Sequence, residues 1–240
     1  MISVCIATYN GALYITEQLA SICAQLSADD EIIISDDGST DRTLDVVRDF
    51  GDPRIRIVRN NSQRCYTANF ENALSYAKGD YIFICDQDDV WLPNKVETVV
   101  HCLRDEGYSV VAHDAIITDA SLTPTGPSYY RIKGHIFRGL SGNLIRFSFL
   151  GCCLAVRKEV LKKALPFPSD HLLCTHDNWL FLCASAFGRA KVLDQPLIYY
   201  RRHAGNTSQG GQNEHKPWTF RIRYRLYLIA HLIRRATLIS

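Results

Sequence analysis

The sequence lacks the patterns that mark several large classes of protein. Its nine cysteines include no Cys-x-x-Cys pair, so zinc sites and thioredoxin-like sites have little support. Their number is odd and their spacing shows no disulfide framework, which favours a reducing compartment. The net charge of +2 gives no overall signal for nucleic acid. After the first predicted strand there is neither a Gly-Lys-Ser/Thr triplet nor a Gly-x-Gly-x-x-Gly pattern, which argues against two common nucleotide-binding loops.

Long apolar segments are also missing. No apolar run reaches the length needed to span a bilayer. The first four residues enter a predicted strand at once, without the charged and apolar regions of a signal peptide. We therefore expect a cytoplasmic protein, or one held peripherally on the inner face of the cytoplasmic membrane.

Alternating strands and helices fill the first half of the chain. Short apolar runs predict the strands, and apolar residues at helical spacing predict the helices between them. The predicted strands cover residues 2–7, 31–35, 55–58 and 81–85, and the predicted helices cover 13–25, 41–50, 67–77 and 93–104. This alternation predicts an α/β fold with a Rossmann-like, mostly parallel central sheet flanked by helices on both sides.

The second half is less regular. The predicted strands cover residues 110–117, 152–156 and 192–200, the predicted helices cover 158–165 and 176–187, and a loop covers 121–130. Pro196 predicts an edge position for the last strand, because proline cannot donate a hydrogen bond to a neighbouring strand. We expect one domain over residues 1–215, with a nucleotide-sugar-binding half in 1–107 and an acceptor-side half in 108–215.

Three predicted strands end in polar sequences. These are Ala-Thr-Tyr-Asn-Gly at 7–11, Asp-Asp-Gly-Ser-Thr-Asp at 36–41 and Asp-Gln-Asp-Asp at 86–89. The carboxyl ends of parallel strands meet at one edge of a sheet, where open α/β sheets bind their ligands. Crowded carboxylates suit Mg²⁺ or Mn²⁺, which are commonly held by one or two carboxylates together with substrate phosphates.

A purely structural explanation exists for each of these motifs. Asp88 or Asp89 could cap a helix that enters through Pro93, and Ser39 or Asp41 could cap the predicted helix over 41–50. Residues 7–11 on their own would make an ordinary loop between a strand and a helix. Agreement of all three motifs at one sheet edge favours a ligand site.

Taken in order, the three motifs resemble glycosyltransferase family 2, the inverting enzymes of GT-A fold. The last motif continues as Val90–Trp91, and Tyr-Arg-Arg-His-Ala-Gly-Asn-Thr-Ser follows at 200–208. Both are similar to the bacterial rhamnosyltransferase-like branch that builds surface polysaccharides. The resemblance implies a dTDP-rhamnose or UDP-hexose donor and a glycan or polyprenyl-diphosphate-linked acceptor. Transfer would proceed with inversion in O-antigen, capsule or exopolysaccharide assembly.

The resemblance also implies roles for single residues. The nucleotide would lie against Thr8, Tyr9, Asn10, Asp37 and Asp86, with Asp37 at the base. Mn²⁺ or Mg²⁺ would be held by Asp86, Asp88 and His203 and would neutralise the leaving diphosphate. Asp177 would be the general base that deprotonates the acceptor hydroxyl. The residues expected near the sugar or the acceptor are Asp89, Trp91, Gly151, His176 and Trp179.

Several of these residues have simpler explanations. An acid such as Asp177 in the first turn of a helix is stabilised by the helix dipole. A lone histidine such as His203 is more often structural than a ligand, and Gly151 suits close packing equally well. His176 departs from the resemblance, because many relatives carry glutamate there.

The segment 216–240 mixes six Lys and Arg residues with aromatic and aliphatic residues, and it contains no acid. This composition predicts an amphipathic element that lies on an anionic membrane surface. Packing on the catalytic domain, or on a second copy of it, is the alternative.

Two other functions compete with glycosyl transfer. A nucleotidyltransferase would need a Gly-rich triphosphate loop with Arg or Lys, and residues 7–11 contain neither. A non-catalytic scaffold that binds nucleotide sugars would have no need of Asp86, Asp88 and Asp177 together.

Overall fold

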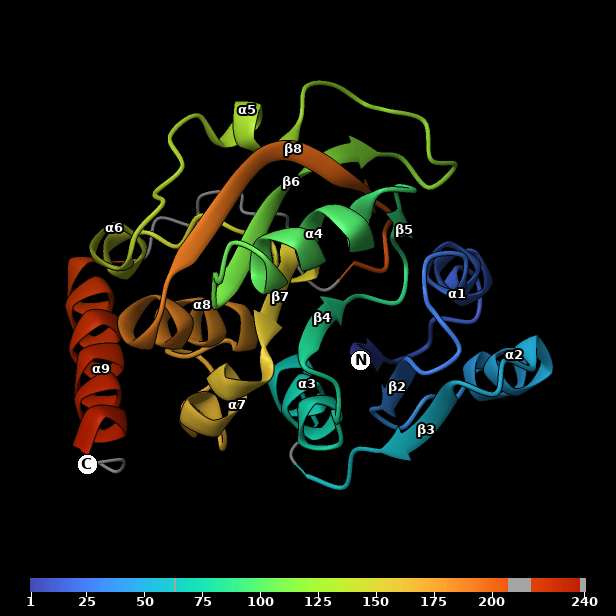
Figure 1. The fold of residues 1–240 in the computed structure, drawn as a ribbon, viewed down its shortest axis with the longest axis horizontal. Helices are drawn as coiled ribbons and strands as arrows, with labels where there is room; N and C mark the ends of the chain where they lie inside the picture. The colour runs from blue at the N-terminus through green and yellow to red at the C-terminus, as the bar shows by residue number, and fades with distance from the viewer. Residues whose placement is uncertain (63, 207–216, 238–240) are drawn as a thin grey trace.

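The computed structural model describes residues 1–62, 64–206 and 217–237, and one eight-stranded sheet runs through it (Figure 1). Its strand order is β3-β2-β1-β4-β7-β6-β8-β5. The strands are β1 (Ile2–Thr8), β2 (Glu31–Asp36), β3 (Ile55–Arg59), β4 (Tyr81–Cys85), β5 (Val90–Trp91), β6 (Val110–Thr118), β7 (Leu154–Arg157) and β8 (Ala190–Arg201). The helices are α1 (Ile15–Cys23), α2 (Thr43–Phe50), α3 (Tyr66–Ser75), α4 (Lys95–Arg104), α5 (Tyr129–Lys133), α6 (Leu140–Ile145), α7 (Lys158–Ala164), α8 (His176–Phe187) and α9 (Trp218–Thr237), with a 3₁₀ turn η1 (Gly151–Cys153).

Strand direction brings the carboxyl ends of six strands to one edge. β1 is parallel to β2 and β4, and β2 is parallel to β3. β7 is antiparallel to both β4 and β6, and β8 is parallel to β6. As a result β1, β2, β3, β4, β6 and β8 all run the same way. The predicted mostly parallel sheet is confirmed, and its carboxyl edge carries the three polar motifs.

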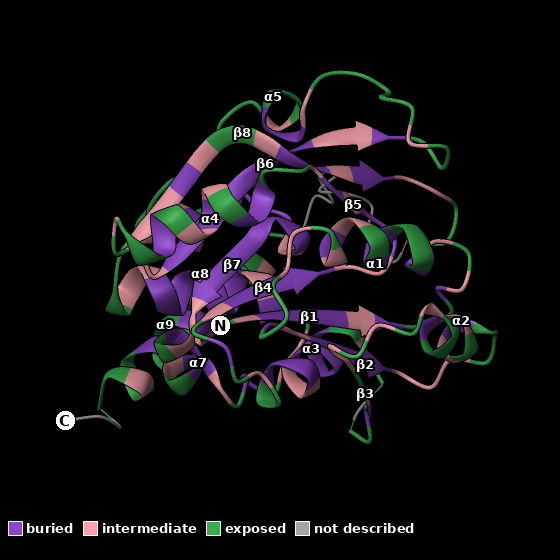
Figure 2. Cartoon of the chain, turned by 45° about the vertical axis from the view of Figure 1, so that its right-hand side comes forward, coloured by how far each residue is buried: buried purple, intermediate pink, exposed green. Residues whose placement is uncertain are grey.

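The core lies between the sheet and helices on its two faces (Figure 2). α1 and α4 approach each other on one face, where Gln25 of the α1 end accepts a hydrogen bond from the Val96 amide. α3, α7 and α8 pack together on the other face. Strand residues such as Ile33 and Phe83 are fully buried, and each such side chain contributes about 1.5–3 kcal/mol to stability.

The structure corrects the prediction of a strand over 152–156. Cys152 and Cys153 belong to η1, where the Cys153 amide donates to the Leu150 carbonyl at 3.1 Å, and β7 begins only at Leu154. Two short helices, α5 and α6, and the two-residue strand β5 were not predicted. These elements are too short for a periodic apolar pattern to form.

The predicted edge position holds for Pro196 alone and not for its strand, because β8 lies between β6 and β5. β5 covers only Ile198 and Tyr199 of β8, so in the described chain Pro196 is paired on one side alone, opposite Asp114 of β6. The register between β6 and β8 shifts at this point. The missing proline donor therefore leaves no gap in the ladder.

Arg54 ties the start of β3 to the end of α1. Its guanidinium donates to the carbonyls of Cys23 and Leu26 at 3.2 and 2.7 Å and to the Asp52 carboxylate at 2.7 Å. Both side chains of this ion pair are largely buried, with exposed fractions of 16% and 14%. Hydrogen bonds from Arg54 hold the pKa of Asp52 well below its usual range.

We expect Asp52→Asn to lower the free energy of unfolding by about 1–3 kcal/mol at pH 7, because the charged pair and its hydrogen bonds are lost. Because the pKa of Asp52 is lower in the folded than in the unfolded state, its ionised carboxylate stabilises the folded protein fully above the unfolded pKa of about 4. This stabilisation is lost as the pH falls from there through the folded pKa. Urea denaturation between pH 3 and 7 measures it. Asp45→Asn, at an exposed pair with Arg48, is the control. A difference from wild type that does not shrink below pH 4 would contradict this assignment.

Candidate active site

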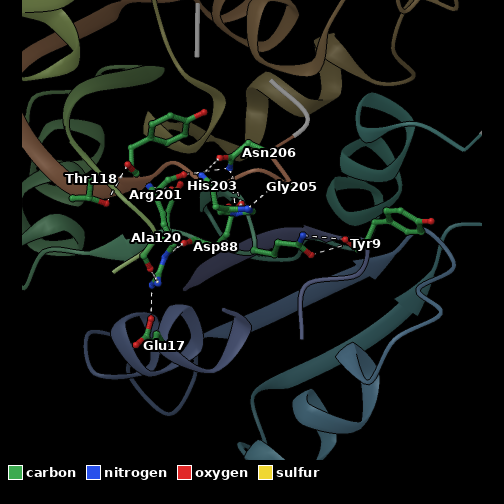
Figure 3. Close-up of polar contacts among 12 residues, drawn as sticks. Tyr9, Glu17, Asp88, Thr118, Ala120, Arg201, His203, Gly205 and Asn206 are labelled. Atoms are coloured by element: carbon green, nitrogen blue, oxygen red, sulfur yellow. Dashed lines mark hydrogen bonds and ion pairs between the residues drawn. The ribbon is translucent and has the colours of Figure 1, made fainter. Parts of the chain in front are cut away.

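The loop after β4 carries the acidic motif, and residues that follow β8 close over it (Figure 3). Asp88 is nearly buried, and its Oδ2 lies 2.8 Å from His203 Nε2. The same oxygen accepts a hydrogen bond from Asn206 Nδ2 at 3.0 Å. Residues 115 or more positions apart in the chain therefore meet at one carboxylate. The 200–208 segment is described only to Asn206, so its last two residues lie outside the described range.

Arg201 fixes the path of this loop, although the sequence analysis did not single it out. Its guanidinium donates to the carbonyls of Asp88 and Ala120, each at 2.8 Å, and to the Glu17 carboxylate. Its backbone amide donates to Asp89 Oδ1 at 3.1 Å. The side chain is 4% exposed, so its charge is balanced by Glu17 rather than by water. The sequence feature that could have pointed to Arg201 is its position directly after the predicted strand 192–200.

A second group of ligand atoms lies beside Asp88. Oxygens of Asp86 and Asp89 and the Cys152 sulfur lie within 4.8 Å of one another. Burial, with the neighbouring charges of Asp88 and Asp177, raises the pKa of Asp86 to about 7. Burial and the charges of Asp88 and Asp86 likewise raise the pKa of Asp89 well above its usual range.

These carboxylates fit a divalent cation. Asp89 Oδ2 is buried and has no hydrogen-bond partner among the described residues, so part of the donor set is unsatisfied. Hard oxygen donors crowded in this way suit Mg²⁺ or Mn²⁺. Two of the three predicted metal ligands, Asp88 and His203, contact each other. The third, Asp86, lies beside Asp89 and Cys152 instead.

The proposed capping role of Asp88 and Asp89 is wrong. α4 begins at Lys95 with Asn94 before it, and no side chain caps it. The carboxylates of Asp88 and Asp89 instead bond residues of the β8 end. The N-cap of α2 is Arg42 rather than Ser39 or Asp41, but Asp41 Oδ1, one residue earlier, accepts from the Thr43 amide at 2.9 Å.

The loops after β1 and β4 are joined through Gln87. Its side-chain amide accepts from the Tyr9 amide and donates to the Tyr9 carbonyl, both at 3.0 Å (Figure 3). A Cβ on Gly11 would lie 2.2 Å from Gln87 Oε1, so a side chain there would displace the Gln87 amide from Tyr9. Asn10, with a positive φ of 51°, accepts from the Thr40 amide at 2.8 Å and so links this loop to the end of β2.

The two aspartates at the end of β2 differ in role: one carboxylate is bonded within its own turn, and the other is partly exposed. Asp36 is buried and accepts from the Gly38 and Ser39 amides, each at 3.0 Å. Asp37 is half-buried and accepts from Asn60 Nδ2 at 2.8 Å, and burial raises its pKa. The side chain of Thr8 is buried. Its backbone carbonyl accepts a hydrogen bond from the Asp37 amide at 2.9 Å.

Asp177 and the acidic loop meet across η1. A Cβ on Gly151 would lie 2.5 Å from His176 Nε2 and 3.4 Å from Asp177 Cβ, so only glycine lets the start of α8 approach this closely. Cys152, the next residue, reaches Asp86 and Asp89. Asp177 Oδ1 accepts from the Asn178 amide at 2.8 Å, and its Oδ2 has no partner among the described residues.

Four residues predicted to lie near the sugar or the acceptor are buried instead. Trp91 is 3% exposed and packs against Phe83 with ring centres 5.3 Å apart. Trp179 is fully buried and donates to the Ala164 carbonyl at 2.9 Å. Neither indole presents a surface to a sugar, and the fully buried Asp89 presents none either. His176 is also buried, stacks on Phe70 at 4.0 Å, and has its pKa lowered by burial.

Comparison with known protein families identifies the family of this chain. The model of the family described as Glycosyl transferase family 2 matches residues 3–165, which include all three polar motifs. The chain belongs to glycosyltransferase family 2. The resemblance in the sequence is thereby confirmed, and the protein is a glycosyltransferase.

Three curated relatives of this glycosyltransferase span most of the chain. An Escherichia coli UDP-Glc:alpha-D-GlcNAc-diphosphoundecaprenol beta-1,3-glucosyltransferase, WfaP, is 28% identical over 87% of this chain and 80% of its own length. The Shigella flexneri dTDP-rhamnosyl transferase RfbG is 29% identical over 83% of this chain and 72% of its own. The chain spans 66% of an uncharacterized Nostoc glycosyltransferase, alr2836, that is 29% identical over 85% of this chain.

Solved structures show the same fold. Staphylococcus aureus TarS in complex with UDP-GlcNAc has a TM-score of 0.71 at 18% identity, over 100% of this chain and 73% of that one. The Pyrobaculum calidifontis mannosyltransferase PcManGT with GDP-Man and Mn²⁺ has a TM-score of 0.63 at 19% identity, over 100% and 76%. The glycosyltransferase therefore has the expected GT-A fold.

We expect Arg201→Lys to weaken Mn²⁺ binding about 10- to 100-fold, because lysine keeps the charge but not the hydrogen bonds that hold the carbonyls of Asp88 and Ala120. Mn²⁺ titration followed by electron paramagnetic resonance measures this directly. Arg48→Lys, on the exposed side of α2, is the matched control. Equal Mn²⁺ affinity in Arg201→Lys and wild type would show that the loop holds its shape without this residue.

Proposed function

We propose that this glycosyltransferase moves a sugar from a nucleoside-diphosphate donor to an acceptor hydroxyl, with inversion and with the help of Mn²⁺ or Mg²⁺. The observation that carries the proposal is the meeting of two acidic elements across η1. Asp86 and Asp88 follow β4, Asp177 opens α8, and Gly151 and Cys152 lie between them. A diphosphate at the first element and an acceptor at the second would be close enough to react.

The chain's own residues account for the two ends of the displacement. Asp177 takes the proton of the acceptor hydroxyl through its Oδ2. The acceptor oxygen then forms a bond to the sugar's anomeric carbon, while the bond from that carbon to the diphosphate oxygen breaks and the diphosphate keeps the electron pair. Attack opposite the leaving group inverts the anomeric carbon.

Residues at the sheet edge hold the donor. Asp88, His203 and Asp86 would bind the cation, which neutralises charge on the departing diphosphate. Tyr9 and Asn10 border the nucleotide site through the loops they join, and Asp37 accepts a hydrogen bond from the base. Thr8 supports that site indirectly, because its carbonyl accepts a hydrogen bond from the Asp37 amide.

The relatives support two donor classes. WfaP is named for UDP-glucose and a diphosphoundecaprenol-linked acceptor, and RfbG is named for dTDP-rhamnose. For this chain we propose a UDP-hexose or dTDP-rhamnose donor and a glycan or polyprenyl-diphosphate-linked acceptor in bacterial surface-polysaccharide assembly. The domain would comprise residues 1–215, with donor and acceptor halves meeting near residue 107.

We expect Asp177→Asn to lower turnover by about 10²–10⁴-fold while donor binding stays unchanged, because the amide cannot accept the hydroxyl proton. Donor hydrolysis and transfer to an acceptor preparation measure turnover, and calorimetry measures donor binding. Asp194→Asn, at a site 72% exposed on β8, is the control. Full activity of Asp177→Asn would remove the general-base role from this residue.

We expect either UDP or dTDP to bind more tightly with Mn²⁺ than without it, and we expect Asp88→Asn to abolish that difference. The reason is that Asp88 would help to hold a cation that reduces the charge of the bound diphosphate. Isothermal titration calorimetry of both nucleotides, with and without Mn²⁺, is the measurement. If folded wild-type protein bound neither nucleotide, with or without Mn²⁺, the proposed donor site and the mechanism built on it would be wrong.

A further inference from the structure

α9 packs on the acceptor half by one face, which we call the inner face. Leu228 of this face is fully buried and Leu232 is 8% exposed, and α9 contacts both α6 and α8. The packing alternative for the C-terminal segment therefore describes the inner face, whereas the membrane alternative concerns the opposite face and stays a prediction. Among the helices in the described residues, none combines the length and the apolar character needed to cross a membrane.

Arginines of α9 tie the helix to loops of the acceptor half. Arg225 donates to the Ile145 carbonyl at 3.0 Å, and Arg235 donates to the Leu165 carbonyl at 3.1 Å. Because these hydrogen bonds come in addition to the buried leucines, we expect α9 to keep its place when a single hydroxyl is removed from it.

Two tyrosines of α9, three residues apart, each bond the acceptor half through the hydroxyl. The Tyr227 hydroxyl accepts from the Asp170 amide at 2.9 Å, and the Tyr224 hydroxyl accepts from Asn178 Nδ2 at 3.2 Å. Both tyrosines are half-buried. Their contacts differ in place, because Asp170 lies in the loop before α8, whereas Asn178 directly follows Asp177 in the first turn of α8.

Asn178 connects the Tyr224 hydroxyl to the Asp177 carboxylate. Its backbone amide donates to Asp177 Oδ1 at 2.8 Å. Its side chain is buried, and among the described residues Tyr224 is the one hydrogen-bond partner of that side-chain amide, since the buried Oδ1 has none. Without the Tyr224 hydroxyl the whole buried amide would be unpaired, which favours its movement toward water or new partners. The backbone that holds Asp177 would move with it.

The turn that carries Asp177 is held by two other helices. Burial and the charge of Asp177 raise the pKa of the Tyr224 phenol, so an uncharged hydroxyl of α9 lies near this carboxylate. His176, the residue before Asp177, is buried and stacks on Phe70 of α3 at 4.0 Å. α3 and α9 therefore both constrain the orientation of the Asp177 side chain.

We propose that Tyr224 is a positioning residue for glycosyl transfer: by holding Asn178, it keeps the Asp177 carboxylate in the orientation that accepts the proton of the acceptor hydroxyl. The inference rests on the proposed function, in which Asp177 is the general base. Tyr224 itself contacts no reacting atom in this role. Its loss should therefore slow turnover and leave the donor site, at the ends of β1, β2 and β4, unchanged.

Removal of one hydroxyl tests the proposal, with a matched removal on the same helix. We expect Tyr224→Phe to lower kcat by about 10- to 100-fold, because a small displacement of a reacting group is costly, and the KM for the donor to stay within about twofold of wild type. Tyr227→Phe, which also loses one hydrogen bond of α9, should keep the wild-type kcat. The assay follows hydrolysis of UDP-glucose or dTDP-rhamnose, and transfer to GlcNAc-diphosphoundecaprenol, the acceptor for which WfaP is named. Thermal unfolding verifies that both variants are folded.

A double-mutant cycle separates positioning from a general loss of structure. In an Asp177→Asn background, Tyr224→Phe should cause no further loss of turnover, because the group that Tyr224 positions is already gone. Carboxyl ¹³C NMR of protein labelled at aspartate gives a second readout without any substrate. Tyr224→Phe should shift the Asp177 signal, assigned from its absence in Asp177→Asn, and Tyr227→Phe should leave that signal in place.

Two outcomes would overturn the inference. The first is equal kcat in folded Tyr224→Phe and Tyr227→Phe. The second is a loss on Tyr224→Phe in the Asp177→Asn background as large as the loss in wild type, which would show that Tyr224 acts independently of Asp177. Full activity of Asp177→Asn alone is a different result, since it would contradict the proposed function. An inactive Asp177→Asn with a fully active Tyr224→Phe would leave the proposed function standing and remove only the role of Tyr224.

Discussion

Repulsion between carboxylates at the carboxyl edge of the sheet is the constraint on which the rest of the site depends. Burial and the charges of Asp88 and Asp177 raise the pKa of Asp86, and burial and the charges of Asp88 and Asp86 raise the pKa of Asp89. An arrangement of this kind is stable only if protons or a cation reduce the charge. The fold holds the carboxylates together nonetheless, which is the expected property of a site built to receive a cation and a diphosphate.

Arg201 shows how the fold holds that arrangement. A buried guanidinium is costly unless its donors are paired, and here they meet two carbonyls and the Glu17 carboxylate. The carbonyl of Asp88 is one of those acceptors, so the path of the acidic loop is coupled to the end of β8 and to α1. His203 and Asn206 then follow two and five residues after Arg201 and reach the Asp88 carboxylate. The buried guanidinium of Arg201 thus aligns three segments that are remote in sequence.

The acceptor half uses close packing for the same purpose. Gly151 allows the start of α8 to approach η1, and the inner face of α9 bonds the residue that follows Asp177. The start of α8, which carries the general-base candidate, is therefore held by contacts with both η1 and α9.

The sequence by itself determined the α/β alternation, the family and the acidic motif, because apolar periodicity and short motifs are local properties. It also identified Asp177 at the start of α8 and the basic, apolar character of α9. It could not separate Asp36, buried in its own turn, from the half-buried Asp37 on chemistry alone. The pairing of Asp88 with His203, the grouping of Asp86 with Asp89 and Cys152, and the burial of Trp91 and Trp179 were decided by the tertiary structure. Each depends on contacts between segments far apart in the chain, and no local pattern records which face of a strand or helix a distant segment will cover.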